Sequence, residues 1–153
     1  MSAVCLIDTT IFAEILNIPG MTSRRDEIFE SLQQKIAANE SLFLPMATIF
    51  ETGNHIAQNG DGTQRRKCAE LFVEQVQKAL DGTIPFTPLS FPTSEDMQKW
   101  LADFPDSAMR KSGIGDLSII HEWNRQCALN HGRRVYIWSL DEHLSGHDQP
   151  ARI

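Results

Sequence analysis

The sequence predicts an α/β domain with a central, mostly parallel sheet of four or five strands and helices on both faces. Short apolar runs that suit buried strands alternate along the chain with longer segments whose apolar residues recur at helical spacing. The length of 153 residues, with 41% hydrophobic and 22% charged residues, is typical of one globular domain with a full core. We therefore expect a single domain over residues 1–153.

In the first half of the chain, the run Ala3 to Ile7 is apolar and partly β-branched, which fits a strand in the middle of a sheet. Helical stripes and Pro, Gly or Asn residues mark the elements that follow. The expected elements are a strand over 3–7, a helix capped by Thr9 and Thr10 through about Asn17, a helix from Ser23 to about Asn39, a strand over 42–44, and helices over 48–58 and 63–80. Within the 48–58 helix we expect Ile49, Phe50, Ile56 and Ala57 to face inward and Gly53 to allow close packing.

The second half begins with three interleaved prolines, which favour an edge strand or an extended connector over residues 83–91. The stripe Met97, Trp100, Leu101 and Phe104 predicts a helix from Ser94 that Pro105 stops. A polar, basic loop over 106–115, a helix opened by Asp116 and ended by Gly132, and a strand over 135–138 complete the expected elements.

Charge and cysteine content narrow the classes of protein. Fourteen Lys and Arg against twenty Asp and Glu give a net charge of −6, which argues against a protein that coats nucleic acid electrostatically but leaves a nuclease open. The three cysteines, Cys5, Cys68 and Cys127, form no CxxC pair and suit reduced core thiols. The N-terminus has no basic region and no long apolar stretch follows, so we expect a cytoplasmic protein without a signal peptide or membrane span.

Four acids are expected at one edge of the sheet, because ligands bind where the carboxyl ends of parallel strands converge. Asp8 ends the first strand, Glu51 lies early in the helix after the second, Asp116 starts a helix, and Asp141 follows the last strand. Each also has a structural interpretation: Thr48 to Glu51 matches a capping box, Asp116 is a typical N-cap, and an acid after a strand is common in turns.

The four segments together resemble the ordered motifs of PIN domains. The segments are Cys5-Leu-Ile-Asp8-Thr-Thr-Ile-Phe, Pro45-Met-Ala-Thr-Ile-Phe-Glu51, Gly113-Ile-Gly-Asp116-Leu-Ser-Ile-Ile and Tyr136-Ile-Trp-Ser139-Leu-Asp141. The resemblance extends from residue 4 to about 144, and it implies a three-layer α/β fold. The chain departs from the family pattern at Leu117, at Trp123 and at Glu142-His143.

The resemblance implies a metal-dependent endoribonuclease, of the kind found as toxins in VapBC-type toxin–antitoxin pairs. Asp8, Glu51, Asp116 and Asp141 then match the four family acids that hold Mg²⁺ or Mn²⁺, with Asp8 and Asp116 as direct ligands and the other two acting through water. Thr10 and Ser139 match residues that hold the carboxylates or bind phosphate. RNA is the implied substrate, and an antitoxin protein and a second copy of the chain are implied partners.

The residue chemistry is consistent with this hypothesis. Mg²⁺ prefers carboxylate oxygens, keeps several waters, and needs no full protein cage. Crowded carboxylates repel one another unless a cation compensates them. A bound ion would lower the pKa of its water and neutralise charge on the scissile phosphate.

The basic pairs are less specific, since most such pairs lie on solvated surfaces. Arg110 and Lys111 are the best candidates for contacting an RNA backbone because they shortly precede Asp116, and Arg24-Arg25 comes second. Stacking of bases on Trp100 or Trp123 competes with core packing. The spacing of His143 and His147 gives only a weak zinc pattern.

Other classes fit less well. A haloacid-dehalogenase-like phosphatase needs an Asp where Thr10 stands, and a response-regulator receiver needs an acidic pair after the first strand and a Lys late in the chain. A nuclease for DNA flaps or structured RNA would need an additional threading element. The main alternative is a non-catalytic PIN domain that serves as an RNA-binding or protein-interaction module.

Overall fold

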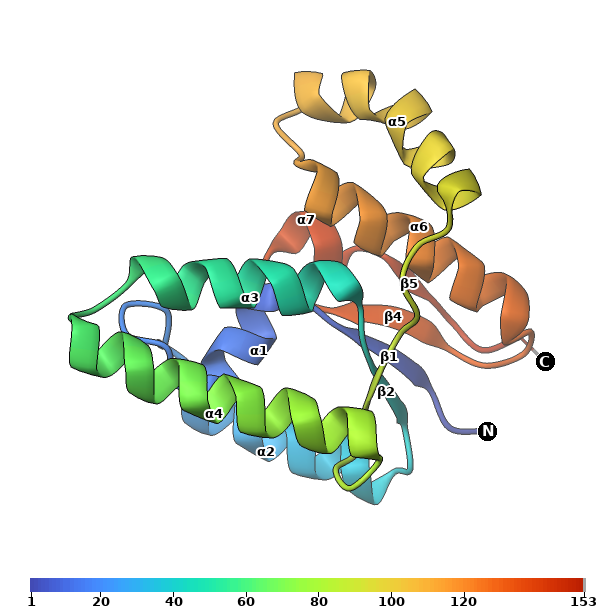
Figure 1. The fold of residues 1–153 in the computed structure, drawn as a ribbon. Coiled ribbons are helices and arrows are strands. Elements are labelled where there is room, and N and C mark those ends of the chain that lie inside the picture. The colour runs from blue at the N-terminus through green and yellow to red at the C-terminus, as the bar shows by residue number, and fades with distance from the viewer. Residues whose placement is uncertain (153) are drawn as a thin grey trace.

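The computed structural model describes residues 1–152 and is an α/β domain built on one five-stranded sheet (Figure 1). The elements follow the chain in the order β1 (Val4–Ile7), α1 (Thr9–Leu16), α2 (Arg25–Ala37), β2 (Ser41–Leu44), α3 (Met46–Gln58), α4 (Gly62–Asp81), β3 (Phe86–Pro88), α5 (Ser94–Met109), α6 (Ile114–Leu129), β4 (Val135–Trp138), α7 (Glu142–Ser145) and β5 (Asp148–Gln149).

The sheet has the strand order β3-β2-β1-β4-β5, with β1 in the middle as its continuous burial requires. The first four strands in this order are parallel, and only β5 is antiparallel, pairing Val135 with Gln149. Because β1, β2 and β4 run in the same direction, their carboxyl ends meet at one edge of the sheet. The expected mostly parallel sheet is therefore confirmed, and the proline-rich segment is its edge strand β3.

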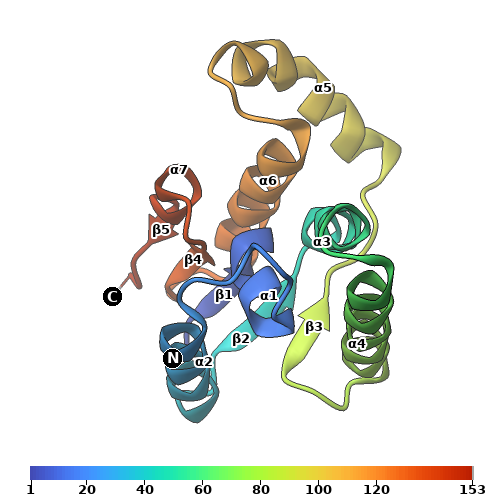
Figure 2. The same cartoon turned by 90° about the vertical axis from the view of Figure 1, so that its left-hand side faces the viewer.

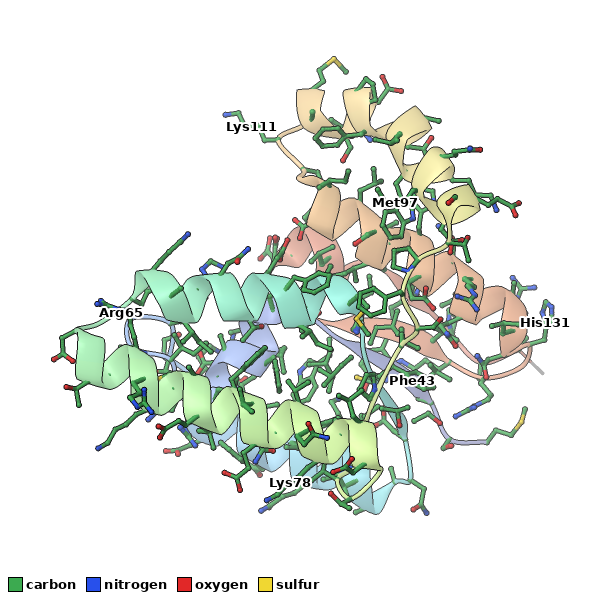
Figure 3. All side chains as sticks on the ribbon, in the orientation of Figure 1. Phe43, Arg65, Lys78, Met97, Lys111 and His131 are labelled. Atoms are coloured by element: carbon green, nitrogen blue, oxygen red, sulfur yellow. The ribbon has the colours of Figure 1, made fainter. Side chains whose placement is uncertain are left out.

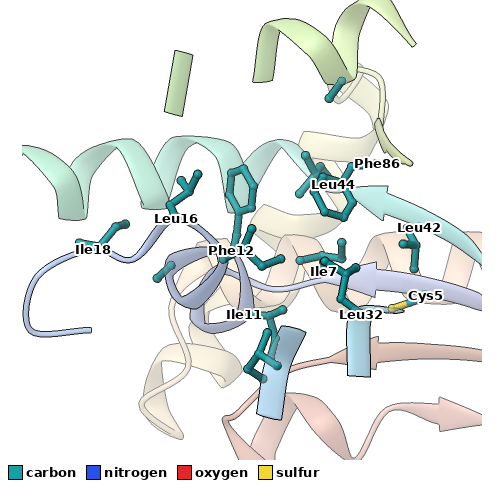
Figure 4. Packing of buried hydrophobic residues seen from close by; sticks show 14 of the residues in the cluster. Cys5, Ile7, Ile11, Phe12, Leu16, Ile18, Leu32, Leu42, Leu44 and Phe86 are labelled. Carbon is teal, nitrogen blue, oxygen red and sulfur yellow. The ribbon is translucent and has the colours of Figure 1, made fainter. Parts of the chain in front are cut away.

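Each face of the sheet is covered by helices, which gives three layers (Figure 2). On one face, Cys5, Ile7 and Leu44 pack with Phe12 of α1 and Leu32 of α2, as the close view in Figure 4 shows. On the other face, residues one position along the same strands point the opposite way. The buried strand side chains on this face are Val4, Leu6, Val135 and Ile137, of which Leu6 and Ile137 lie in one cluster with Ile119 of α6 and Leu144 of α7.

Several local expectations are wrong in detail. The helix α3 begins at Met46 with Pro45 as its N-cap, so Thr48 and Glu51 form no capping box. Phe50 and Ala57 are exposed rather than inward, whereas Ile56 is buried and Gly53 packs against the Phe72 ring as expected. The capping box does not form because the Thr48 hydroxyl bonds to Ile7 and the Glu51 carboxylate bonds to Thr9, both distant in sequence.

The α5 and α6 boundaries also differ from the sequence expectation. Pro105 lies inside α5, which continues through Met109. The loop expected over 106–115 is therefore reduced to residues 110–113. Helix α6 starts at Ile114 with Gly113 as its N-cap, and Asp116 is therefore a first-turn residue rather than the cap. The short elements α7 and β5 were not expected.

Helix α5 lies farther from the sheet than the other helices and packs mainly on α6 (Figures 1 and 2). Of its residues only Ser107 is buried, while Leu101 of its apolar stripe is exposed, as is Met109 at its end. In residues 1–152, none of the helices combines the length and the apolar character needed to cross a bilayer.

Candidate acidic site at the carboxyl edge of the sheet

Asp8 is the fixed centre of the candidate site. It follows β1 directly, is only 2% exposed, and caps α1 by accepting a 2.6 Å hydrogen bond from the Thr9 amide. Its second oxygen accepts hydrogen bonds from the Thr10 hydroxyl at 2.8 Å and from the Ser139 hydroxyl at 2.5 Å. Three donors therefore hold one carboxylate in a single orientation.

The two hydroxyls also anchor the loop that carries Asp141. The Leu140 amide donates to Thr10 Oγ1 at 3.0 Å, and the Asp141 amide donates to Ser139 Oγ at 2.9 Å. Asp141 itself caps α7 by accepting from the His143 amide, and it is exposed to solvent. The structure thus places Thr10 and Ser139 as holders of Asp8, with Asp141 on a loop that they fix.

Glu51 reaches the same edge from α3. Its carboxylate accepts a 3.1 Å hydrogen bond from the Thr9 hydroxyl, which follows Asp8 in the chain. The helix is tied to the end of β1 by the buried Thr48 hydroxyl, which donates to the Ile7 carbonyl at 2.7 Å. A side chain at Gly115 would collide with the Glu51 carboxylate, so the glycine before Asp116 lets α6 approach α3 closely.

Asp116 completes the group from the first turn of α6. Burial, and after it the negative charges of Asp8, Glu51 and Asp141 in that order, raise the pKa of its carboxyl from 3.8 to about 6, while His143 acts to lower it. An effect of three carboxylates on Asp116 requires that each of them lies near Asp116. The structure therefore places Asp8, Glu51 and Asp141 around Asp116, at the edge of the sheet that the sequence indicated.

The donor set suits a hard divalent cation, since it consists of carboxylates and hydroxyls. Within residues 1–152, no three His, Cys, Asp or Glu side chains stand close enough, as placed, to hold a metal ion by themselves. Coordination would have to be completed by water or by a phosphate of the substrate, which is usual for Mg²⁺.

The basic candidates have different surroundings. Arg110 is the C-cap of α5, and Lys111, labelled in Figure 3, lies on the loop that joins α5 to α6. Both are exposed and neither makes a salt bridge in the part of the chain described. Arg24, by contrast, pairs with Glu27 on the surface of α2. The Arg110 and Lys111 side chains are therefore available to a ligand.

The remaining sequence candidates are structural. The Trp123 indole donates to the Val135 carbonyl and packs against the sheet. The three cysteines carry free thiols, two of them buried, and burial raises the pKa of Cys5 to about 12. The His143 and His147 rings are 6.5 Å apart between centroids, and they do not belong to a metal-binding group within residues 1–152.

Sequence reasoning gave no role at the acidic site to four residues that the structure places around it: Thr9, Glu14, Gly115 and His143. Glu14 is almost fully buried, and its Oε1 accepts from the backbone amides of Ser23 and Arg24, so it ties the start of α2 to α1. An acid within the apolar α1 segment was the signal that could have identified it. The glycine immediately before Asp116 was the corresponding signal for the close contact with Glu51.

Comparison of the chain with protein-family models, curated proteins and solved structures found no match.

Proposed function

We propose that the protein is a metal-dependent endoribonuclease that hydrolyses RNA phosphodiester bonds. The observation that carries the proposal is the convergence of Asp8, Glu51, Asp116 and Asp141, from four separate segments, at the edge where parallel strands end. The likeness of these ordered segments to PIN-domain motifs supports the reaction class. A cluster of acids at this edge suits a cation that binds phosphate.

Asp8 and Asp116 are the proposed direct ligands of Mg²⁺ or Mn²⁺. Asp8 is preorganised by its three hydrogen bonds, and the raised pKa of Asp116 signals charge that a cation would compensate. The bound ion would supply a water of lowered pKa and neutralise charge on the phosphate. Glu51 and Asp141 would orient water, and Thr10 and Ser139 would keep Asp8 in place.

The resemblance also carries the proposal that the protein is the toxin of a type II toxin–antitoxin pair in the cytoplasm. An antitoxin protein and a second copy of the chain are then its proposed partners. The exposed apolar residues Leu101 and Met109 on α5 offer surface for such a contact.

Cleavage of RNA tests the proposed function. Purified protein is incubated with a panel of structured RNAs, including transfer RNAs, with Mg²⁺ or Mn²⁺ and with EDTA, beside Asp8→Asn and the exposed control Asp26→Asn. We expect cleavage that needs the metal, is lost in Asp8→Asn and persists in Asp26→Asn. RNA binding without cleavage under any metal would instead support the alternative, a non-catalytic RNA-binding module. Cleavage retained by Asp8→Asn or in EDTA would contradict the proposed mechanism.

A further inference from the structure

An apolar groove of about 270 Å³ lies between α3, α5 and α6, and we call it the α3/α5/α6 groove. Its apolar lining includes Phe50 from α3, Met97 and Trp100 from α5, and Ile114 from α6. Figure 3 shows Met97 on the part of α5 that lies above α6. Apolar concave surface of this kind usually receives a ligand or a partner.

Phe50 presents an exposed aromatic ring at this groove, next to the exposed ring of Phe91. Phe50 is 54% exposed although α3 has a buried face that could have received it, and Phe91, which follows β3, is 68% exposed. Their ring centroids are 6.1 Å apart with planes inclined by 43°. The Phe50 ring therefore keeps a face that is not covered by the core.

The groove is continuous with the acidic site. Glu51 and Gly115 line the groove, and the same two residues meet where α3 and α6 bring their acids together. Phe50 directly precedes Glu51, and Gly115 directly precedes Asp116. A ligand held at the carboxylates would thus have its adjoining part beside the Phe50 ring.

Among the residues that line the groove only Glu51 is charged, and the cations that a nucleic acid strand would need lie on the adjoining loop. The loop joining its two walls α5 and α6 carries Arg110 and Lys111, both exposed and outside any salt bridge within residues 1–152. A nucleic acid strand presents flat apolar bases to aromatic rings and phosphates to cations. The groove, the basic loop and the acidic site together offer partners for a base, for flanking phosphates and for a metal-bound phosphate.

We propose that the α3/α5/α6 groove takes one unstacked nucleobase of single-stranded RNA, next to the phosphate at the acidic site, with Phe50 as the stacking platform. This inference rests on the proposed function and adds its substrate class. Because every base has a π-face and the groove is mainly apolar, binding is tolerant of base identity. Paired RNA is excluded, since its bases remain stacked within the helix.

Equilibrium binding in EDTA tests the inference without any cleavage. A fluorescent 12-nucleotide single-stranded RNA and its duplex are titrated with wild type, Phe50→Ala, Phe50→Trp and the control Val73→Ala, an exposed apolar position on α4. We expect Phe50→Ala to weaken single-strand binding roughly tenfold. Phe50→Trp and Val73→Ala should bind as wild type does, and the duplex should bind more weakly than the single strand.

A second readout locates the base. With ¹³C-methyl methionine, the ring current of a base in the groove should shift the signals of Met46 and Met97, which line it, and leave Met21 unchanged. Single-strand binding with unmoved Met46 and Met97 signals, or undiminished in Phe50→Ala, would overturn the inference. So would absence of binding, or shifts caused by self-association at high protein concentration without RNA.

The two proposals fail in different ways. Groove shifts on RNA binding together with no metal-dependent cleavage would uphold the inference and remove the nuclease function. Metal-dependent cleavage with a KM unchanged in Phe50→Ala would uphold the nuclease function and remove the inference that the groove binds a base.

Discussion

Ser139 donates a 2.5 Å hydrogen bond to Asp8 across 131 residues of sequence, and it joins the carboxyl ends of the neighbouring parallel strands β4 and β1. The Ser139 hydroxyl also accepts from the Asp141 amide, so one side chain sets both the orientation of one acid and the position of another. The positions of Asp8 and Asp141 are therefore set together by hydrogen bonds at the edge of the sheet.

Replacing Asp8 separates its role in the fold from its role in the site. Asp8→Ala removes the cap of α1 and leaves the Thr10 and Ser139 hydroxyls without their acceptor, so we expect a loss of about 2 kcal/mol in the free energy of unfolding. Asp8→Asn keeps the oxygen that caps α1, and rotating hydroxyls can accept from its amide, so the loss should stay below about 1 kcal/mol. Urea denaturation of both variants measures the two losses in the free energy of unfolding. Equal destabilisation by Asp8→Asn and Asp8→Ala would contradict the expected difference.

Asp116 makes stability depend on pH with a defined sign. Because burial and the neighbouring acids raise its pKa to about 6 from 3.8, the folded chain holds this proton more tightly than the unfolded chain. The resulting loss of stability grows as the pH rises from about 4 to about 6 and is constant above. Asp116→Asn should therefore be more stable than wild type by about 1 kcal/mol at pH 7, a value reduced by solvent screening of this half-buried group.

The measurement for Asp116 is urea denaturation of wild type and Asp116→Asn at several pH values between 4 and 7. The difference in the free energy of unfolding should shrink as the pH falls, and Asp26→Asn, on the exposed side of α2, should show no such trend. A constant difference across this range would refute the proposed charge crowding.

Lys111 carries backbone strain at the end of α5. Its φ of 62° lies in the left-handed region, where a helix usually ends with glycine. We expect Lys111→Gly to gain about 1 kcal/mol of stability. In the same variant, the slope of the logarithm of the RNA-binding constant against the logarithm of the salt concentration should become shallower by about one. Thermal denaturation and binding at several salt concentrations measure the two effects, with Lys111→Arg as the charge-preserving control. A gain in stability without any change in salt dependence would remove Lys111 from the proposed RNA-binding surface.

Thr48 couples α3 to the end of β1 through a buried hydrogen bond. Thr48→Val keeps the side-chain shape but leaves the Ile7 carbonyl without this donor, so we expect a loss of about 1–3 kcal/mol. Thr48→Ser keeps the hydroxyl and should lose less, since only a methyl group is removed. Calorimetric melting of the two variants compares them, and a more stable Val variant would show that the hydrogen bond is not important.

Sequence patterns predicted the parts of the molecule that local chemistry determines. The apolar runs at β1, β2 and β4 are strands because buried strands read as continuous hydrophobic segments, and Asp8 and Asp141 follow them at the same edge. The acids could be grouped from sequence because parallel strands place their carboxyl ends together.

The details that failed depend on contacts between distant segments. Thr48 matched a capping box, but its hydroxyl bonds to Ile7 and Glu51 bonds to Thr9, neither of which a four-residue pattern contains. Pro105 did not end α5, which continues to Met109, and the turn beyond the helix is held by a hydrogen bond from the Ser107 hydroxyl to the Ser112 carbonyl. Such partners become visible only when the chain is folded.

The central claim is that the four acids form one site for a divalent cation, and binding of Mn²⁺ followed by electron paramagnetic resonance tests it most directly. Wild type should bind Mn²⁺ competitively with Mg²⁺, Asp116→Asn should bind it at least tenfold more weakly because a ligand charge is lost, and Asp26→Asn should match wild type. Mn²⁺ binding that is absent from wild type, or equal in wild type and Asp116→Asn, would contradict the account.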